Sequence, residues 1–390
     1  MADKTKNKTE NKTGNWALNK SRISQATGRL GAGLDTLRTW WDGAQVWQRY
    51  VVYLLLVVGA LILPAPAIGS FMSPESDWTT ILIHPIGTYV LLAMGLNVVV
   101  GQAGLLDLGY VAFFAIGGYS LAYFGTEYGW NFWATLVMGT MMTGVSGVIL
   151  GAPTLRLRGD YLAIVTLGFG EIVRITASNT DEIGGARGIT NIPHPPPIFG
   201  TEFALDPAPY YYLIVSVIVV VIIFAKRLEK SRVGRAWAAI REDEDAAELM
   251  GVPTFKFKLL AFATGAMIGG LAGTVWAGKV IFIEPNNFPF ILSATILAAV
   301  VLGGQGNIPG VILGAFLIAW IPERLRFLAE YRILIFGAVL VLMMAVRPEG
   351  LLPSGRRRAE LAEGTGGMGA MGAEVAGPTA TDAAIPEARS

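Results

Sequence analysis

The stretch PYYYLIVSVIVVVIIFAKRLEKSRVGRAWAAIREDEDAAELMGVP, residues 209–253, joins two segments of opposite character. Its first part, 209–225, contains no charged residue, whereas seven of the nineteen residues in 235–253 are charged. An uncharged apolar run approaching 20 residues is long enough to cross a membrane as a helix. The stretch therefore predicts a membrane span that is followed, outside the membrane, by a polar helix.

The composition of the whole chain is that of an integral membrane protein. Of its 390 residues 53% are hydrophobic and only 15% are charged, whereas soluble domains carry about 25% charged residues. The chain contains no cysteine, which excludes a disulfide framework, a thiolate nucleophile and a cysteine-bound cluster. Its two histidines, His84 and His194, leave little material for a metal site.

Apolar runs along the chain predict an all-α polytopic integral membrane protein with about ten transmembrane helices. They cover residues 46–69, 79–100, 105–125, 131–152, 161–178, 209–225, 258–281, 289–304, 309–327 and 333–347. The polar segment before the first run is too long for the n-region of a signal peptide, so we expect this run to be a retained span.

The distribution of Lys and Arg predicts the orientation of these spans. If both termini are cytoplasmic, the inside segments and the inner end of the first span hold 24 of the 30 Lys and Arg residues. This bias follows the positive-inside rule, with Arg324, Arg326 and Arg332 as the main exception. We expect a multi-pass protein in the lipid bilayer of a bacterial cell membrane, and the net charge of +1 gives no general attraction for nucleic acid.

Three parts of the chain are distinguished by composition. Residues 1–45 form a basic cytoplasmic extension that we expect to be disordered, residues 46–353 form the transmembrane domain, and 354–390 read as a disordered cytoplasmic tail. Within the domain, the Gly- and Pro-rich segment 179–208 is the longest external loop, and we expect an ordered cap over the outer face. His194 in this loop is either a contact for a binding protein or an exposed residue without a role.

The charged segment 235–253 is expected to form one short amphipathic helix in a cytoplasmic loop. Four residues fall on one narrow stripe, interrupted by Asp243: Ala236, Ile240, Ala247 and Met250. Gly251 suits the C′ position that ends a helix, and Pro253 follows where the helix cannot continue. Helices that lie on a membrane surface usually carry Lys and Arg on the polar face. The acidic face of this one favours docking to a protein over a solvated or membrane-bound loop helix.

Two groups of polar residues inside the spans are candidates for the translocation path. Glu171 and Arg174 lie three residues apart on one helical face, as either a structural ion pair or a pair of charges that meets the solute. Asn97, Gln102 and Asp107 lie in a glycine-containing run that suggests tight packing or a broken helix. Their side chains are expected either to orient the solute or to cap backbone groups.

Packing glycines and absent motifs narrow the class of protein further. Gly265, Gly269 and Gly273 are spaced to place three glycines on one helix face, which predicts close contact within a bundle or across a subunit interface. The chain has no G-x-x-x-x-G-K-[ST] phosphate loop, since GGQGNIPG (303–310) lacks the Lys and the hydroxyl residue. It also has no H-E-x-x-H motif, which argues against an intramembrane metallohydrolase.

Several sequence blocks carry a resemblance to a known family. They are GLNVVVGQAGLLDLGYVAFFAIGGY (95–119), GDYLAIVTLGFGEIVRI (159–175), NTDEIGGARGI (179–189), DAAELMG (245–251), ILAAVVLGGQGNIPGVILGA (296–315) and VRPEGLLP (346–353). Together they resemble the permease subunit of branched-chain amino acid ABC importers across roughly residues 46–353. DAAELMG is similar to the Glu-Ala-Ala-xxx-Gly coupling motif of ABC-importer permeases, with Asp245 in place of Glu.

The resemblance implies a transporter subunit that is not itself an enzyme and binds no cofactor. ATP and Mg would be bound by two separate cytoplasmic ATPase subunits, which would contact the coupling residues: Arg235, Glu244, Asp245, Ala246, Ala247 and Gly251. A second homologous permease subunit would complete the path, and an extracytoplasmic solute-binding protein would deliver leucine, isoleucine or valine. Urea and short-amide permeases belong to the same wider group. An ion-coupled secondary transporter and a receptor-like membrane protein remain the alternatives from other classes.

Overall fold

The computed structural model describes residues 77–155, 160–197 and 207–324, with short pieces at 59, 62–65, 69, 203, 337–338, 341 and 350–352. Residues 64–390 form one compact unit, which contains the helix bundle. The expected terminal segments 1–45 and 354–390 lie outside the described residues, as do nearly all of the expected first span and last span.

The first described span is a bent rod of four consecutive pieces. It consists of α4 (Trp78–Ile81), the π-helical turn η1 (Leu82–Gly87), α5 (Thr88–Leu96) and the π-helical turn η2 (Asn97–Gln102). Asp77 caps its start by accepting hydrogen bonds from the backbone N–H groups of Thr79 and Thr80. The extended backbone of His84 produces a bend inside η1.

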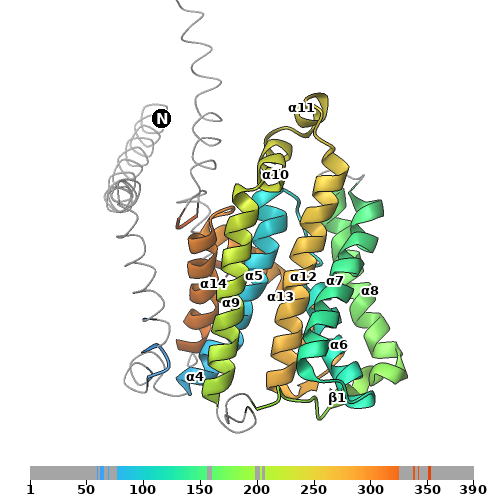
Figure 1. Ribbon diagram of the computed structural model, residues 1–390, viewed down its shortest axis with the longest axis vertical. Helices are drawn as coiled ribbons and strands as arrows, with labels where there is room; N and C mark the ends of the chain where they lie inside the picture. The colour runs from blue at the N-terminus through green and yellow to red at the C-terminus, as the bar shows by residue number, and fades with distance from the viewer. Residues whose placement is uncertain are drawn as a thin grey trace, which may run out of the picture. The chain divides into compact units, whose positions relative to one another are not determined.

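Within the described residues, seven more long helices follow, with a pair of short ones between them (Figure 1). The long helices are α6 (Val111–Glu127), α7 (Phe132–Thr154), α8 (Asp160–Asn179), α9 (Pro207–Lys230), α12 (Thr254–Val280), α13 (Phe290–Gly303) and α14 (Ile308–Arg324). The short helices α10 (Arg232–Glu242) and α11 (Glu244–Leu249) connect α9 to α12.

The helices match the expected spans closely. Six described segments are long and apolar enough to cross a membrane. They are Trp78–Gln102, Phe132–Thr154, Tyr161–Asn179, Pro207–Lys230, Thr254–Val280 and Pro285–Gly303. The two remaining helices, α6 and α14, have 17 residues each and coincide with the expected third and ninth spans. The protein is therefore an all-α, multi-pass membrane protein.

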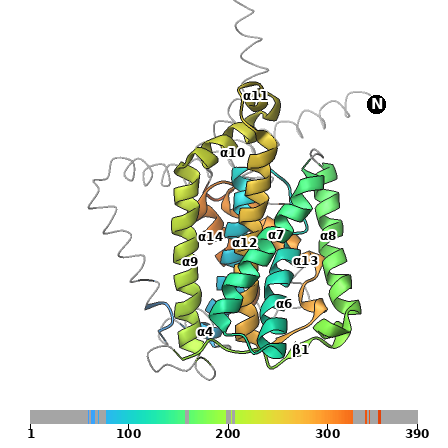
Figure 2. The same cartoon turned by 45° about the vertical axis from the view of Figure 1, so that its right-hand side comes forward.

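The helix α12 runs through the middle of the bundle and packs against α6, α7 and α5 (Figures 1 and 2). Its glycines face these neighbours: Gly265 lies against Gly95 of α5, and Gly269 lies against Phe113 of α6. A methyl group on Gly117 of α6 would overlap with the backbone of Gly270, so the two helices meet at their main chains. This confirms the expected close contact of the 265–269–273 face within a bundle.

One end of the bundle is closed by the segment that follows α8. The turns η3 (Asp181–Ile183) and η4 (Gly185–Arg187) lead into β1 (Ile189–Thr190), which pairs antiparallel with β2 (Phe282–Ile283) after α12. A further turn, η5 (Pro285–Asn287), follows β2. We call this end the β1 end and the opposite one, which carries α10 and α11, the α11 end (Figure 1).

The part of the expected external cap that the structure describes, residues 179–197, lies at the β1 end and contacts the bundle. Pro193 lies against Gly125 of α6. The Nδ1 atom of His194 lies 2.9 Å from the Tyr210 hydroxyl and 3.1 Å from the Gly278 carbonyl oxygen. The reading of His194 as an idle, exposed loop residue is therefore wrong, because its ring holds the cap to α9 and α12.

Candidate functional site

The charged stretch after α9 forms a helical arm, residues 232–251, that extends from the α11 end (Figure 1). The expectation of a single helix over 235–253 is wrong, because the chain breaks at Asp243, whose φ of −154° and ψ of 112° are extended. The Asp243 carboxylate accepts a hydrogen bond from the Ala246 N–H at 3.0 Å and so caps α11. Asp is a strong N-cap residue, and capping is favoured here over continuing one helix.

The break changes which apolar residues of the arm are buried. Ala236, Ile240 and Ala247 are buried as expected, but Met250 is 85% exposed and Leu249 is 88% exposed. The stripe cannot extend to Met250 because α11 does not continue the rotation of α10. The stripe predicted from the sequence also omits Trp237, which is fully buried and donates a 2.7 Å hydrogen bond from Nε1 to the Phe257 carbonyl. Its spacing of three residues from Ile240 is the signal that could have found it.

The end of the arm confirms the expected role of Gly251. The backbone N–H of Gly251 donates to the Glu248 carbonyl at 2.9 Å, and that of Val252 donates to the Ala247 carbonyl at 3.0 Å. This is the Schellman pattern, which requires a left-handed C′ residue, and Gly251 has a φ of +84°. Pro253 then caps α12. The exposed pair Leu249 and Met250 is therefore held at the tip of the arm by a defined turn.

Arg241, on the last turn of α10, makes the first anchor between the arm and the bundle. Its Nη1 atom donates a hydrogen bond to the carbonyl of Gly101 in η2. Its aliphatic stem lies against Gly104, where a methyl group would overlap with it. Asn97, also in η2, accepts a 2.8 Å hydrogen bond from the N–H of Gly306 in the turn between α13 and α14. The arm, η2 and the α13–α14 turn thus meet at one junction.

Glu244, the first residue of α11, makes the second anchor. Its Oε1 atom lies 2.6 Å from Nζ of Lys258, and the Lys258 side chain is buried. The same Nζ donates a 3.3 Å hydrogen bond to the carbonyl of Leu155, which follows the last turn of α7. A buried charge requires an opposite charge or hydrogen bonds. This pair therefore fixes α11 to the first turn of α12 and the end of α7.

Most of the remaining residues expected to contact an ATPase lie on the outside of the arm. Arg235, Asp245 and Ala246 are exposed, whereas Ala247 faces the bundle. Arg235 donates a 3.2 Å hydrogen bond to the Lys230 carbonyl at the end of α9. Of the expected coupling residues, Glu244 is thus paired with Lys258 and Ala247 is buried, whereas Arg235, Asp245, Ala246 and Gly251 are exposed.

Residues 103–110 form the broken segment that the glycine-containing run suggested. The chain passes from η2 to α6 without a continuous helix. The N–H groups of Ala103 and Leu105 still donate to the carbonyls of Val98 and Val99, whereas two later N–H groups of the segment bond to side chains. Leu108 donates to Oγ1 of Thr166 in α8 at 3.0 Å, and Gly109 donates to Oδ1 of Asp107 at 2.9 Å. Val111, the first residue of α6, donates to Oγ of Ser293 in α13 at 2.9 Å. Irregular backbone inside a membrane protein is stable only with such partners.

Asn97 and Asp107 therefore act as backbone caps in this conformation. Gln102 differs, because both polar atoms of its amide are buried and neither has a hydrogen-bond partner among the residues the structure describes. The Oδ2 atom of Asp107 is also buried and has no hydrogen-bond partner among the described residues. Unpaired polar atoms thus remain at Gln102, just before the broken segment, and at Asp107 in its middle.

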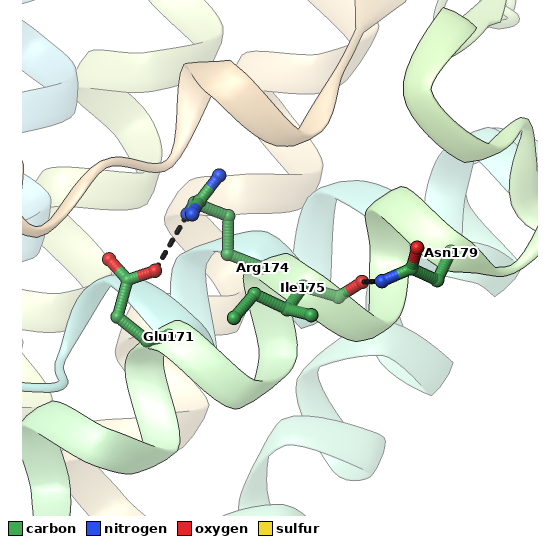
Figure 3. Close-up of polar contacts among 4 residues, drawn as sticks. All are labelled: Glu171, Arg174, Ile175 and Asn179. Atoms are coloured by element: carbon green, nitrogen blue, oxygen red, sulfur yellow. Dashed lines mark hydrogen bonds and ion pairs between the residues drawn. The ribbon is translucent and has the colours of Figure 1, made fainter.

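Glu171 and Arg174 form an ion pair on α8 (Figure 3). Nε of Arg174 lies 2.8 Å from Oε2 of Glu171, and the side chains of Arg174 and Glu171 are 31% and 35% exposed, respectively. One turn further along, Asn179 donates a hydrogen bond to the Ile175 carbonyl at 2.9 Å. Within the described segments, no hydrogen bond or ion pair joins Glu171 or Arg174 to Asn97, Gln102 or Asp107, so the five candidates do not form one polar cluster.

Comparison with known proteins gives the family. Residues 80–344 match the model of the family described as branched-chain amino acid transport system, permease component. The chain therefore belongs to this family of transport permeases, in agreement with the resemblance in its sequence blocks. No solved structure matches the chain significantly.

Individual relatives include permease proteins of branched-chain amino acid transport systems. The chain is 42% identical to the high-affinity branched-chain amino acid transport system permease protein LivM of Escherichia coli, over 83% of this chain and 79% of the relative. It is 27% identical to LivH of Escherichia coli, over 68% of this chain and 91% of the relative. It is also 24% identical to the fructose import permease protein FrcC of Rhizobium meliloti, over 76% of this chain and 83% of the relative.

Proposed function

We propose that this chain is a transmembrane permease subunit of an ATP-driven importer, which moves leucine, isoleucine and valine from a binding protein into the cytoplasm. Family membership and 42% identity to a branched-chain amino acid permease support the solute class. The observation that carries the mechanism is the helical arm, which is anchored to the bundle by Arg241 and Glu244 and presents an exposed tip.

The charges of the described residues support a cytoplasmic α11 end. Eight Lys and Arg residues lie between 226 and 258, at this end of the bundle. Only Arg187, Lys279 and Arg324 lie at the β1 end among the described residues. By the positive-inside rule, this distribution supports a cytoplasmic arm and an external cap. With the runs 46–69 and 333–347 added as spans, the chain has ten spans and both termini in the cytoplasm.

The proposed assembly contains four kinds of subunit. LivM and LivH are both relatives of this chain, which supports a pair of homologous permeases. The chain carries no phosphate loop, so two cytoplasmic ATPase subunits bind ATP and Mg and hydrolyse the nucleotide. An extracytoplasmic binding protein delivers the solute at the β1 end, where the cap over residues 179–197 offers an ordered surface.

The arm transmits movement of the ATPases to the spans. Asp245, Ala246 and the apolar tip of Leu249 and Met250 form the docking surface, because they are exposed at the outermost part of the arm. Movement of α10 pulls on η2 through Arg241, and movement of α11 pulls on α7 and α12 through Lys258. Both paths reach irregular or terminal backbone, where a helix bundle deforms most easily.

The broken segment 103–110 is the proposed moving part of the translocation path. Gln102 and Oδ2 of Asp107 have unused hydrogen-bonding capacity among the described residues, and they become available to the solute when the segment shifts. Asn97 holds the junction together, and the pair Glu171–Arg174 lies on a different helix.

A variant with Asp245→Lys and Ala246→Trp tests the docking surface. Both positions are exposed, so we expect the protein to insert and to purify as monodisperse material. Binding-protein-stimulated ATP hydrolysis of the reconstituted importer is expected to fall at least tenfold. The matched control is Glu229→Lys, an exposed charge reversal at the same end on α9, which is expected to keep normal hydrolysis. Normal stimulated hydrolysis by the double variant would refute the docking assignment.

A further inference from the structure

The outward face of α8 differs from those of its neighbours. On α7 the most exposed side chains at membrane depth are apolar, including Val137, Met141, Val145 and Ile149. The face of α9 is also apolar, with Val220, Ile223 and Phe224 exposed. These two faces suit lipid. On α8, by contrast, the exposed residues Ile172 and Ile175 lie beside the half-exposed ion pair of Glu171 and Arg174.

The ion pair lies too deep for the lipid headgroups to solvate it fully. At a rise of about 1.5 Å per residue, Glu171 is roughly 12 Å along the axis from Asn179 at the end of the helix. Insertion of a charged residue at the centre of a membrane helix costs about 2.5–3.5 kcal/mol, so such residues face protein or water. For the exposed third of each side chain, protein or water is therefore a more favourable neighbour than lipid.

Gly168, one turn before Ile172 on the same face, gives an independent indication. A methyl group added to Gly168 would meet no atom within 4 Å. The glycines of α7, by contrast, touch the bundle at Gly139, Gly144, Gly147 and Gly151. Small residues in membrane helices are enriched where another helix approaches closely. Gly168 leaves such a space on the outside of the chain, where no described residue fills it.

We infer that the α8 face, defined by Gly168, Glu171, Ile172, Arg174 and Ile175, is the surface that binds the second permease subunit within the membrane. This inference rests on the proposed function, because it requires an importer with paired permeases. The ATPases lie in the cytoplasm and the binding protein lies outside, so neither reaches a site near the middle of a span. A membrane helix of the partner permease reaches it, covers the ion pair and fits against Gly168.

Photo-crosslinking in the complete importer tests this surface. A photoreactive phenylalanine analogue is placed at Ile172 on α8 and, as a matched control, at Val220 on α9, because these side chains are 62% and 63% exposed. We expect Ile172 to form a product with the second permease subunit at a yield at least fivefold above that of Val220. Equal yields at the two positions, or a product of Ile172 with its own chain or with a second copy of it, would overturn the inference.

Copurification separates this inference from the proposed function. If no second permease copurifies with the unmodified chain, the proposed importer fails and the α8 surface fails with it. If the pair copurifies and Ile172 does not crosslink to the partner, only the surface is wrong. A second variant, Gly168→Trp, fills the open space and is expected to lower recovery of the partner at least fivefold, while Val220→Trp leaves it unchanged. Full recovery with a monodisperse Gly168→Trp chain would also contradict the surface.

Discussion

Arg241 donates a hydrogen bond to the carbonyl of Gly101, a residue 140 positions earlier in the chain. This contact joins the last turn of α10 to the π-helical end of the first described span. Because Gly104 lies against the Arg241 stem and Asn97 holds Gly306 nearby, one side chain connects the arm to two breaks in the bundle. The polar arm is therefore attached directly to the membrane helices.

Arg241→Gln is expected to uncouple the proposed importer. Glutamine is too short to reach the Gly101 carbonyl with the same geometry and lacks the charge that strengthens the bond. We expect uptake per ATP hydrolysed to fall at least fivefold, while the ATPases still copurify. The control is Arg232→Gln, an exposed arginine at the start of the same helix, and its ratio is expected to stay within twofold. An unchanged ratio for Arg241→Gln would exclude this residue as a transmitter.

Glu244→Gln is expected to destabilise the isolated chain by about 1.5–3 kcal/mol, the range for a hydrogen bond to a charged group. The change removes the negative charge that faces the buried Lys258 ammonium, which is left with only the Leu155 carbonyl and the neutral glutamine amide as partners. The measurement is the midpoint of thermal unfolding in detergent. Glu248→Gln changes an exposed glutamate on the same helix and is expected to leave the midpoint unaltered. Equal midpoints for the two variants would show that the pair does not stabilise the arm.

Thr166→Val tests how the broken segment is held. Valine keeps the shape of threonine but cannot accept the hydrogen bond from the Leu108 N–H, which then lies without a partner inside the bundle. An unsatisfied buried donor costs about 1–3 kcal/mol. Thr176→Val, an exposed change on the same helix, is the control. We expect a lower unfolding midpoint only for Thr166→Val, and identical midpoints would contradict the assigned bond.

Gly117→Ala tests the contact between α6 and α12. The added methyl group would overlap with the Gly270 backbone, and two packed helices cannot separate locally without loss of neighbouring contacts. We expect a severe loss of monodisperse protein after purification. Gly168→Ala adds the same group on α8, where it meets nothing within 4 Å, and is expected to give a normal yield. A normal yield for Gly117→Ala would show that the helices are further apart than described.

Local sequence patterns predict those features of the fold that depend on residues close together in the chain. The apolar run 209–225 lies within α9, the glycine and proline at 251 and 253 end the arm as expected, and the spaced glycines of α12 face its neighbours. The broken helix near Gly104 is also predicted, since glycines and polar residues interrupt an apolar run there. Each of these features depends on residues that are close together in the chain.

Features that depend on distant contacts cannot be predicted from such patterns. The break at Asp243 escapes a helical wheel, which assumes one continuous helix, whereas the capping bond to Ala246 competes with that helix. Arg241 bonds to Gly101, which is 140 residues away in the chain, and Lys258 bonds to Leu155, which is 103 residues away. No local pattern identifies such partners. From the sequence, Asp107 and Asn97 are either path residues or caps, and only their bonds to Gly109 and Gly306 show the capping role.

ATP-dependent uptake by a defined assembly tests the central proposal most directly. The chain, a second permease and the ATPases are reconstituted in liposomes without an ion gradient, with binding protein and labelled leucine at the β1 end and ATP at the α11 end. We expect uptake that requires ATP and the ATPases and is competed by isoleucine and valine, but not by urea or fructose. Leucine uptake by the chain alone, driven by an ion gradient in liposomes without ATPases, would contradict the account.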